Sequence, residues 1–197
     1  MNFRKINNIV AYLFIIGGVI LLFGKSSWFP DFYNPIFMGV MSLVSAGLIW
    51  LPRFYLNPKN EKQEKVVDLI QSGLSFALVI GSLGSLGFFQ LYRIGIQYDK
   101  ITHFLNSFIL TMVLAKSLVD WKEMRFKKAV AISTVIVLVC GVLWEGYELL
   151  GDSLLGTQML GHYGEFITED TIWDLILNLL GVVFAIFGIK FLNKERN

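Results

Sequence analysis

Residues 129–150 read AVAISTVIVLVCGVLWEGYELL, and this stretch decides the class of fold. The hydrocarbon core of a bilayer is about 30 Å thick, and a helix needs about 20 apolar residues to cross it. The stretch is long enough, and it lacks the period-two alternation that is typical of a strand in a membrane β-barrel. We therefore predict a transmembrane helix over residues 129–150.

Five further apolar runs have the same character. They cover approximately residues 9–23, 35–51, 69–92, 101–119 and 171–192. The sequence thus predicts an all-α, polytopic membrane protein, a bundle of six transmembrane helices in a single integral membrane domain over residues 1–197. Arg4 and Lys5 precede the first run, as in a signal peptide, but no small-residue cleavage site follows it. We expect this run to be retained as a helix.

The composition of the chain excludes several classes of protein. Charged residues make up 16% of the 197 residues, against about 25% in an ordinary soluble domain. The formal net charge is only +2 and no basic face is evident, which argues against a nucleic-acid partner. A single cysteine, Cys140, excludes an internal disulfide and a thiolate metal cluster. The expected partner is the lipid bilayer.

The distribution of lysine and arginine predicts the orientation. Of the 17 Lys and Arg residues, all but Lys25, Arg93 and Lys100 lie at the termini, in the second loop, or in and just before the fourth loop. Cytoplasmic loops are the ones enriched in these residues. We therefore expect a multi-pass protein of the plasma membrane with both termini in the cytoplasm.

Polar residues inside the predicted spans form three stripes, each on one helix face. The stripes are Asp99, His103 and Asn106; Glu145, Glu148 and Asp152; and Asp170, Asp174 and Asn178. A charged side chain near the centre of a membrane helix raises the free energy of insertion by at least about 2.5 kcal/mol. Charged residues at such positions therefore indicate a functional or structural role. In the predicted orientation all three stripes lie in the outer half of the membrane, and we expect an outward-facing Asp/Glu/His site.

The residue types of this site suit a divalent metal such as Zn, Mn, Mg or Fe. The predicted metal ligands are His103, Glu145, Glu148 and Asp174. Glu145 or Glu148 would act as the catalytic base. The predicted substrate-binding or supporting residues are Asp99, Asn106, Asp170, Asn178 and Arg93. Asp99 stands four residues before His103 and could orient its imidazole ring by a hydrogen bond.

Other interpretations of the same residues remain open. Without a metal, the carboxylates would repel one another and share protons, as in acid–base catalysis or a proton relay. The stripes could also be a hydrogen-bond network that joins the helices, and Asp99 and Asp170 could be helix N-caps. The loop before the sixth helix could form a lid, to which His162 and Glu165 would belong.

Arg93 and Lys100 allow two interpretations of their own. They are nearly the only cations on the outer side, so they could pair with an anionic lipid headgroup. They could equally neutralise the acidic loop before the sixth helix.

Three short motifs resemble those of known families. They are Tyr98-Asp99-Lys100-x-x-His103-Phe104, Trp144-Glu145-x-x-Glu148 and Asp170-Thr171-x-x-Asp174. Together they cover roughly residues 90–190 and resemble the uncharacterised YjdF-like membrane family. This resemblance implies a multi-helix protein of a bacterial or archaeal plasma membrane in which the matching polar residues matter, and it names no activity.

A second resemblance is to the VanZ-like family, which is associated with resistance to glycopeptide antibiotics. It rests on the first motif together with Asp174-x-x-x-Asn178-x-x-Gly181. The VanZ-like pattern usually places an arginine before the final aspartate motif, and residues 151–170 contain none. The YjdF-like match is therefore the better of the two.

The expected function is action on a lipid or lipid-linked envelope substrate, by hydrolysis or group transfer. Two other classes stay open. One is a small transporter or proton-coupled permease, against which stands the lack of a matching ionisable stripe in the cytoplasmic halves of the helices. The other is a non-catalytic accessory protein of the envelope, so the sequence leaves enzymatic activity undecided.

Overall fold

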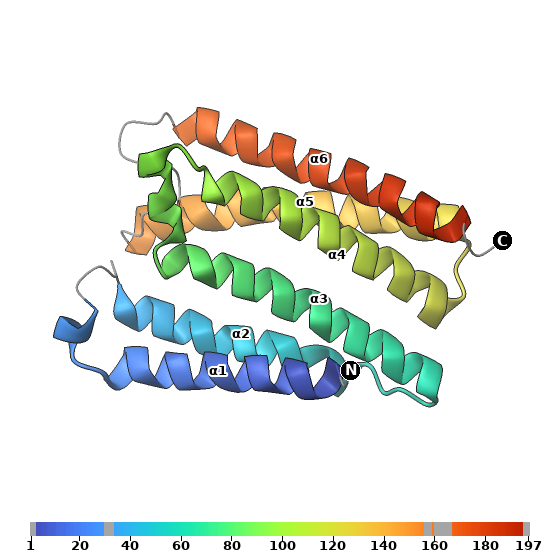
Figure 1. Ribbon diagram of the computed structural model, residues 1–197, viewed down its shortest axis with the longest axis horizontal. Helices are drawn as coiled ribbons and strands as arrows, with labels where there is room; N and C mark the ends of the chain where they lie inside the picture. The colour runs from blue at the N-terminus through green and yellow to red at the C-terminus, as the bar shows by residue number, and fades with distance from the viewer. Residues whose placement is uncertain (1–2, 30–33, 156–158, 160–166, 195–197) are drawn as a thin grey trace. The chain divides into compact units, whose positions relative to one another are not determined.

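The structure is a computed structural model that describes residues 3–29, 34–155, 159 and 167–194. Over these residues the chain forms six long α-helices and no β-strand (Figure 1). The elements are α1 (Phe3–Phe23), η1 (Ser26–Trp28), α2 (Pro35–Tyr55), α3 (Glu61–Ser85), η2 (Phe88–Ile94), α4 (Tyr98–Lys122), α5 (Phe126–Leu155) and α6 (Ile167–Lys194), where η marks a 3-10 helix. All six α-helices are long and apolar enough to cross a membrane. The prediction of an all-α membrane protein with six helices is confirmed.

The third helix departs most from its predicted span of residues 69–92. α3 begins earlier, at Glu61, and ends at Ser85, after which the chain continues into η2. Two glycines bound η2: Gly87 has φ +119° and Gly95 has φ +84°. This left-handed conformation costs glycine little and other residues much. Hydropathy does not reveal this helix end, because η2 is as apolar as the helix before it.

The chain forms two compact units, residues 1–79 and 80–197, which we describe separately. In the first unit α1 and α2 run antiparallel (Figure 1). A Cβ atom on Gly18 of α1 would lie 2.9 Å from the backbone oxygen of Gly39 in α2, so only glycine permits this approach. Ala11, Ala46 and Ile49 form the buried apolar core of this unit. The prediction of one integral domain stays a prediction.

A polar network joins α3 to α2 and α1 in the first unit. Arg53 of α2 bonds Glu64 at 2.9 Å and Asp68 at 2.5 Å, both on α3. Asn7 of α1 donates a hydrogen bond to the hydroxyl of Ser72 at 3.1 Å. These contacts satisfy charged and amide groups that would otherwise be costly to bury.

In the second unit α4 packs closely against α6, and α5 contacts both helices. α4 and α6 begin at the end of this unit where α5 finishes (Figure 1). A Cβ atom on Gly181 of α6 would lie only 2.3 Å from the backbone oxygen of Phe104 in α4. The missing side chain therefore lets the two helices approach closely, three residues beyond Asn178 at the inner end of the α6 polar stripe.

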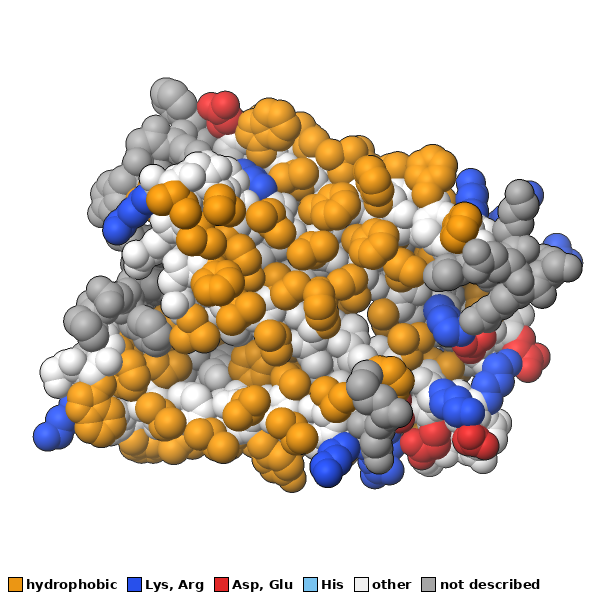
Figure 2. Space-filling model, viewed as in Figure 1, with side chains coloured by type: hydrophobic (Ala, Val, Ile, Leu, Met, Phe, Trp, Pro, Cys, Tyr) orange, Lys and Arg blue, Asp and Glu red, His pale blue; other side chains and the backbone are white. Residues whose placement is uncertain are grey.

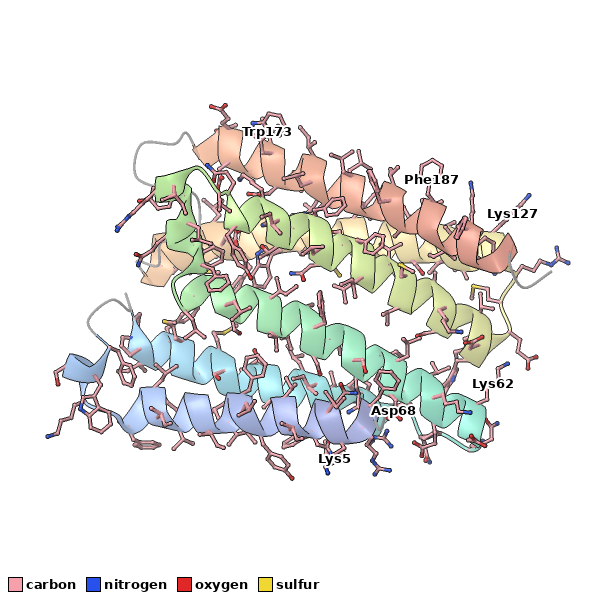
Figure 3. All side chains as sticks on the ribbon, viewed as in Figure 1. Lys5, Lys62, Asp68, Lys127, Trp173 and Phe187 are labelled. Atoms are coloured by element: carbon pink, nitrogen blue, oxygen red, sulfur yellow. The ribbon has the colours of Figure 1, made fainter. Side chains whose placement is uncertain are left out.

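Large apolar side chains point outward along the helices. On α6, Trp173 is 51% exposed and Phe187 is 65% exposed, and both project away from the ribbon (Figure 3). On the visible face, hydrophobic side chains cover the lengths of the helices, and charged side chains gather near helix ends (Figure 2). Such a surface suits lipid rather than water.

Gly181→Ala tests the close contact of α4 with α6. The added methyl group would collide with backbone, and overpacking of this kind costs about 1–3 kcal/mol. We expect a lower midpoint of thermal unfolding for the purified protein in detergent. Gly146→Ala on α5 is the matched control, because its Cβ meets nothing within 4 Å. Equal midpoints for the two variants would contradict the contact.

Candidate functional site

The first turns of α4 carry the residues around which the site is built. α4 begins at Tyr98, so Asp99 and Lys100 lie in its first turn and His103 follows one turn later. The N-cap position belongs to Gln97, not to Asp99. Asp170 likewise lies inside the first turn of α6. The structure therefore does not place Asp99 at the N-cap of its helix, nor Asp170 at that of α6.

His103 lies where the three polar stripes meet. Its Nδ1 atom is 3.8 Å from a carboxylate oxygen of Glu145 on α5. Its Nε2 atom is 3.9 Å from Asp174 on α6 and 3.7 Å from Asp99 on its own helix. One imidazole thus faces carboxylates from three helices, with a different set on each ring nitrogen.

Lys100 occupies the α6 side of this cluster. Its ammonium lies 2.9 Å and 3.0 Å from the two carboxylate oxygens of Asp174. It also donates a hydrogen bond to the carboxylate of Asp170. Because an opposite charge offsets much of the cost of burying an ion, Lys100 neutralises part of the acidic charge brought by α6.

Glu145 on α5 has no comparable partner. Its side chain is buried, with a residue exposure of 6%, and neither carboxylate oxygen has a hydrogen bond within the described part of the chain. The hydroxyl of Thr171 lies nearby on α6 without meeting ordinary hydrogen-bond geometry. A buried carboxylate left in this state is costly and calls for a cation or a proton.

Glu148, one turn further along α5, is held by a neighbour on its own helix. The indole Nε1–H of Trp144 donates a hydrogen bond of 2.7 Å to Glu148 Oε1. Spacing of four residues allows this contact on one helix. The bond fixes one carboxylate oxygen and leaves the other for a further ligand.

Two sets of three side chains bring their ligand atoms within 4.8 Å of one another. One set is Asp99, His103 and Asp174, and the other is His103, Glu145 and Glu148. The sets differ in their neighbours, because Lys100 already holds both oxygens of Asp174, whereas neither oxygen of Glu145 has a hydrogen bond among the described residues. The second set is therefore the better prepared to bind a cation.

The two asparagines lie deeper in the second unit. Asn178 of α6 accepts a hydrogen bond of 2.7 Å from the hydroxyl of Ser107 on α4. A Cβ atom on Gly141 of α5 would lie 2.8 Å from the Asn178 amide nitrogen. Asn106 is partly buried, and its side-chain oxygen has no hydrogen-bond partner among the described residues. Asn178 thus links α4 with α6 directly below the acidic cluster.

Some residues singled out from the sequence lie apart from the cluster. Arg93 is exposed in η2, with its guanidinium 5.9 Å from the centre of the Tyr92 ring, and it forms no ion pair with the cluster residues in the described chain. Asp152 accepts a hydrogen bond from the backbone of Met159 at 2.9 Å. His162 and Glu165 lie outside the described residues.

Sequence reasoning omitted two residues that contact the acidic cluster. Lys100 was expected to pair with a headgroup or with the acidic loop that ends at Asp170, and it bonds Asp170 but also Asp174 inside α6. A signal was present, because Lys100 stands three residues before His103 and so shares its helix face. No contact was predicted for Trp144 beyond its place in a family-like motif, although its spacing of four from Glu148 was an available signal.

Comparisons with known proteins agree with the membrane class. A family described as "Predicted membrane protein (DUF2238)" matches residues 7–194. A relative described as an uncharacterized protein, from Thermotoga maritima, is 27% identical over 161 residues, which cover 77% of this chain and 78% of that protein. No solved structure matches the chain. The YjdF-like resemblance is consistent with this family, and the VanZ-like resemblance stays a prediction.

Lys100→Met tests whether this ammonium stabilises the acidic cluster. Removing one partner of a buried ion pair typically costs about 3–5 kcal/mol, so we expect a markedly lower thermal midpoint. Adding Asp174→Asn should restore part of the loss, because the variant then buries one carboxylate fewer.

Lys25→Met is the control for the loss of a lysine, since Lys25 is exposed and has no ion pair among the described residues. We expect little change in its midpoint. A Lys100→Met variant as stable as Lys25→Met would contradict the neutralising role.

Proposed function

Because the chain belongs to the DUF2238 family of predicted membrane proteins, we propose a function carried out within the bilayer. The protein binds a divalent metal at His103, Glu145 and Glu148, and it acts on a lipid or lipid-linked envelope substrate. The observation that carries this proposal is the buried Glu145 carboxylate, which lies beside His103 and Glu148 and has no hydrogen bond to any residue that the structure describes.

The separation of the ligand atoms fits a small divalent ion. Ligand atoms around a tetrahedral ion with bonds of about 2.1 Å lie about 3.4 Å apart. His103 Nδ1 and Glu145 Oε1 are 3.8 Å apart, so side-chain adjustments of a few tenths of an ångström would bring them into range. One imidazole and two carboxylates suit Zn, Mn, Fe or Mg.

The other face of His103 supports the same assignment. With Nδ1 toward the metal, the Nε2–H points to Asp99 and Asp174, at 3.7 Å and 3.9 Å. A histidine ligand commonly donates its second N–H to a carboxylate, which fixes the ring and its tautomer. Asp174, expected from the sequence to be a metal ligand, would instead orient His103 while Lys100 holds it in place.

Three protein ligands leave a coordination position for water or substrate, as in catalytic metal sites. When bound, the metal would polarise a carbonyl or phosphoryl oxygen and lower the pKa of a bound water. The Glu145 oxygen that does not bind the metal would serve as a base. The cluster lies within about two turns of the start of α4, where a lipid headgroup or ester can reach it.

The acidic cluster lies at one end of the second unit, and this favours the proposed function over that of a permease. Farther along the second unit, the buried polar side chains of the described residues are hydroxyls and an amide, among them Thr111 and Ser133. A proton-coupled path through the membrane would need ionisable groups there as well. The outward orientation and the plasma membrane, both predicted from the lysines and arginines, belong to the same proposal.

Elemental analysis of the purified protein tests the proposed metal directly. We expect one divalent metal per chain in the wild type, and its loss in His103→Ala and in Glu145→Ala. Glu169→Gln is the control, because Glu169 is exposed in the first turn of α6. A wild type without metal, after purification free of chelators and dialysis against each candidate ion, would contradict the proposal.

Trp144→Phe tests how Glu148 is positioned. The change keeps an aromatic ring but removes the N–H that bonds Glu148, and loss of such a supporting contact typically lowers metal affinity about 10- to 100-fold. Titration calorimetry with Zn²⁺ measures the affinity, and Trp173→Phe on α6 is the matched control. The Trp144 bond plays no part in metal binding if both variants keep the wild-type affinity.

A further inference from the structure

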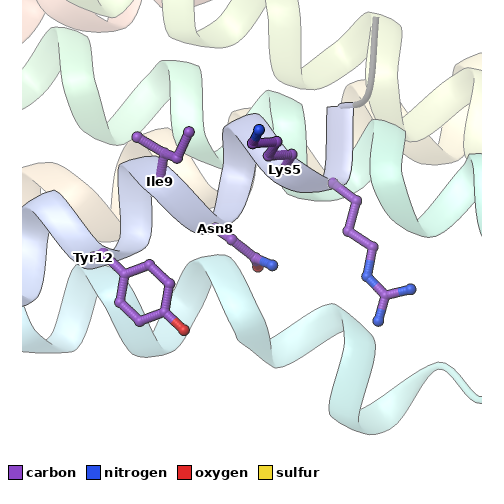
Figure 4. Close-up of a pocket in the computed structure, with 5 residues that line it drawn as sticks. Lys5, Asn8, Ile9 and Tyr12 are labelled. Carbon is purple, nitrogen blue, oxygen red and sulfur yellow. The ribbon is translucent and has the colours of Figure 1, made fainter.

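The buried side-chain amides of the first unit have hydrogen-bond partners in the protein. Asn7 donates to a backbone oxygen and to a hydroxyl of α3, and Gln71 donates to a backbone oxygen of α2. Asn8, which lines a shallow surface pocket on α1 (Figure 4), accepts a hydrogen bond of 3.1 Å from the Trp50 indole. Buried polar groups are normally satisfied in this way.

The second unit differs, because several of its buried polar atoms have no hydrogen-bond partner among the described residues. Two of them belong to side chains that are almost fully buried: Asn178 Nδ2, in a residue that is 4% exposed, and Thr111 Oγ1, in a residue that is 0% exposed. Asn106 Oδ1 and Thr134 Oγ1 are in the same state. A polar atom left unpaired in a protein interior destabilises the fold, so these four atoms call for a ligand.

On α4 the unpaired atoms lie on the face that contacts α6. His103, Ser107 and Thr111 recur every four residues and therefore share one helix face. The Ser107 hydroxyl donates a hydrogen bond of 2.7 Å to Asn178 on α6, so this face is turned toward α6. Asn106, three residues after His103, lies beside the same face.

On α5 the unpaired hydroxyl shares its face with the residues that contact α4 and α6. A Cβ atom on Gly141 would lie 2.8 Å from Asn178 Nδ2, so Gly141 is turned toward α6. Thr134 precedes Gly141 by seven residues and Glu145 by eleven, which are about two and three helix turns. The three residues therefore lie on one face of α5. The unpaired atoms of all three helices are thus directed into the same interior.

Neighbouring hydroxyls show an arrangement that Thr111 and Thr134 do not adopt. Ser117 on α4 and Ser133 on α5 each donate to the backbone oxygen four residues earlier, at 2.7 Å and 2.8 Å. A hydroxyl bonded to its own helix needs no further partner. The unpaired atoms therefore lie between the acidic cluster and these two serines.

The chemistry of the four atoms selects the ligand. Asn178 Nδ2 is a donor, Asn106 Oδ1 is an acceptor, and a threonine hydroxyl acts as either. A cation has no use for an amide donor, and an anion has no use for an amide oxygen. Water both donates and accepts, and it occupies interior sites that offer it two or more polar partners.

The spacing of the polar groups also suits water. At a rise of 1.5 Å per residue, Ser107 lies about 6 Å beyond His103 along α4, and Thr111 lies about 6 Å beyond Ser107. A water molecule bonded to two groups joins atoms up to about 5.6 Å apart, which is twice a hydrogen bond of about 2.8 Å. Successive polar groups along this interior are therefore within reach of bridging water.

We propose that a file of ordered water molecules occupies the interior of the second unit between α4, α5 and α6. The water molecules bond Asn178 Nδ2, Thr111 Oγ1 and Thr134 Oγ1, and the file ends beside Glu145. There it supplies water to the side of the acidic cluster where the metal is proposed. This supply rests on the proposed function, whereas the water sites themselves do not.

A crystal structure of the full chain that resolves ordered water tests the file directly. The protein is first dialysed against EDTA, so that the result does not depend on metal binding. We expect one water molecule within about 3.2 Å of Asn178 Nδ2 and another within the same distance of Thr111 Oγ1. A structure in which either atom lacks a bound water would overturn the proposal.

Thr111→Val tests the same site in the purified protein, because valine keeps the shape of threonine and removes its hydroxyl. Loss of a hydroxyl that bonds water should lower the midpoint of thermal unfolding by about 2–4 °C. A hydroxyl without a ligand predicts the opposite sign, since valine then removes an unpaired polar group and raises the midpoint.

Ser117→Ala is the matched control on the same helix. It also removes one buried hydroxyl, but that hydroxyl is bonded to its own helix, and its loss leaves no water without a partner. We expect little change in its midpoint. A Thr111→Val midpoint equal to that of Ser117→Ala, or above it, would refute the water site at Thr111.

Discussion

Charge buried between membrane helices must be compensated by charge or hydrogen bonds close by, and the second unit is organised around this constraint. α4, α5 and α6 bring five carboxylates together, and among the described residues the one ammonium within this cluster is that of Lys100. Lys100 is directed to α6, where Asp170 and Asp174 receive it. The α5 side is left with Glu145 and Glu148, where a divalent metal would supply the missing positive charge. The uneven placement of the Lys100 charge thus accounts for the ion pairs on the α6 side and for the metal that we propose on the α5 side.

Small residues make this arrangement possible. Gly181 lets the backbone of α6 approach Phe104 of α4, and Gly141 leaves space on α5 for the Asn178 amide. Helix pairs in membranes commonly pack through such residues, because lipid supplies little hydrophobic force to hold helices together. The close packing of α4 against α6 at Gly181 therefore brings their polar side chains together. The hydrogen bond from Ser107 to Asn178 strengthens the contact between these two helices. In the first unit, α1 and α2 likewise approach closely through glycines, where Gly18 faces Gly39.

Much of the fold and part of the site could be predicted from the sequence. Apolar runs of membrane length predicted six helices, and spacings of three and four placed His103, Glu145 and Asp174 on the faces that now meet. The contact of Lys100 with Asp174 could not be predicted, because helix spacing does not reveal which neighbouring helix a face will contact. The end of α3 was missed for another reason, since Gly87 changes the backbone direction without changing hydropathy. Orientation in the membrane stays a prediction from the distribution of lysine and arginine.

The proposed function depends above all on His103 as a metal ligand at the place where α4, α5 and α6 meet. Electron spin-echo spectroscopy of the protein loaded with Mn²⁺ tests it most directly, because a nitrogen bonded to manganese modulates the echo. The chain has two histidines, His103 and His162. We predict coupling to one imidazole nitrogen in the wild type, kept in His162→Gln and lost in His103→Gln. A manganese signal without imidazole coupling, or one that loses the coupling only in His162→Gln, would contradict the claim.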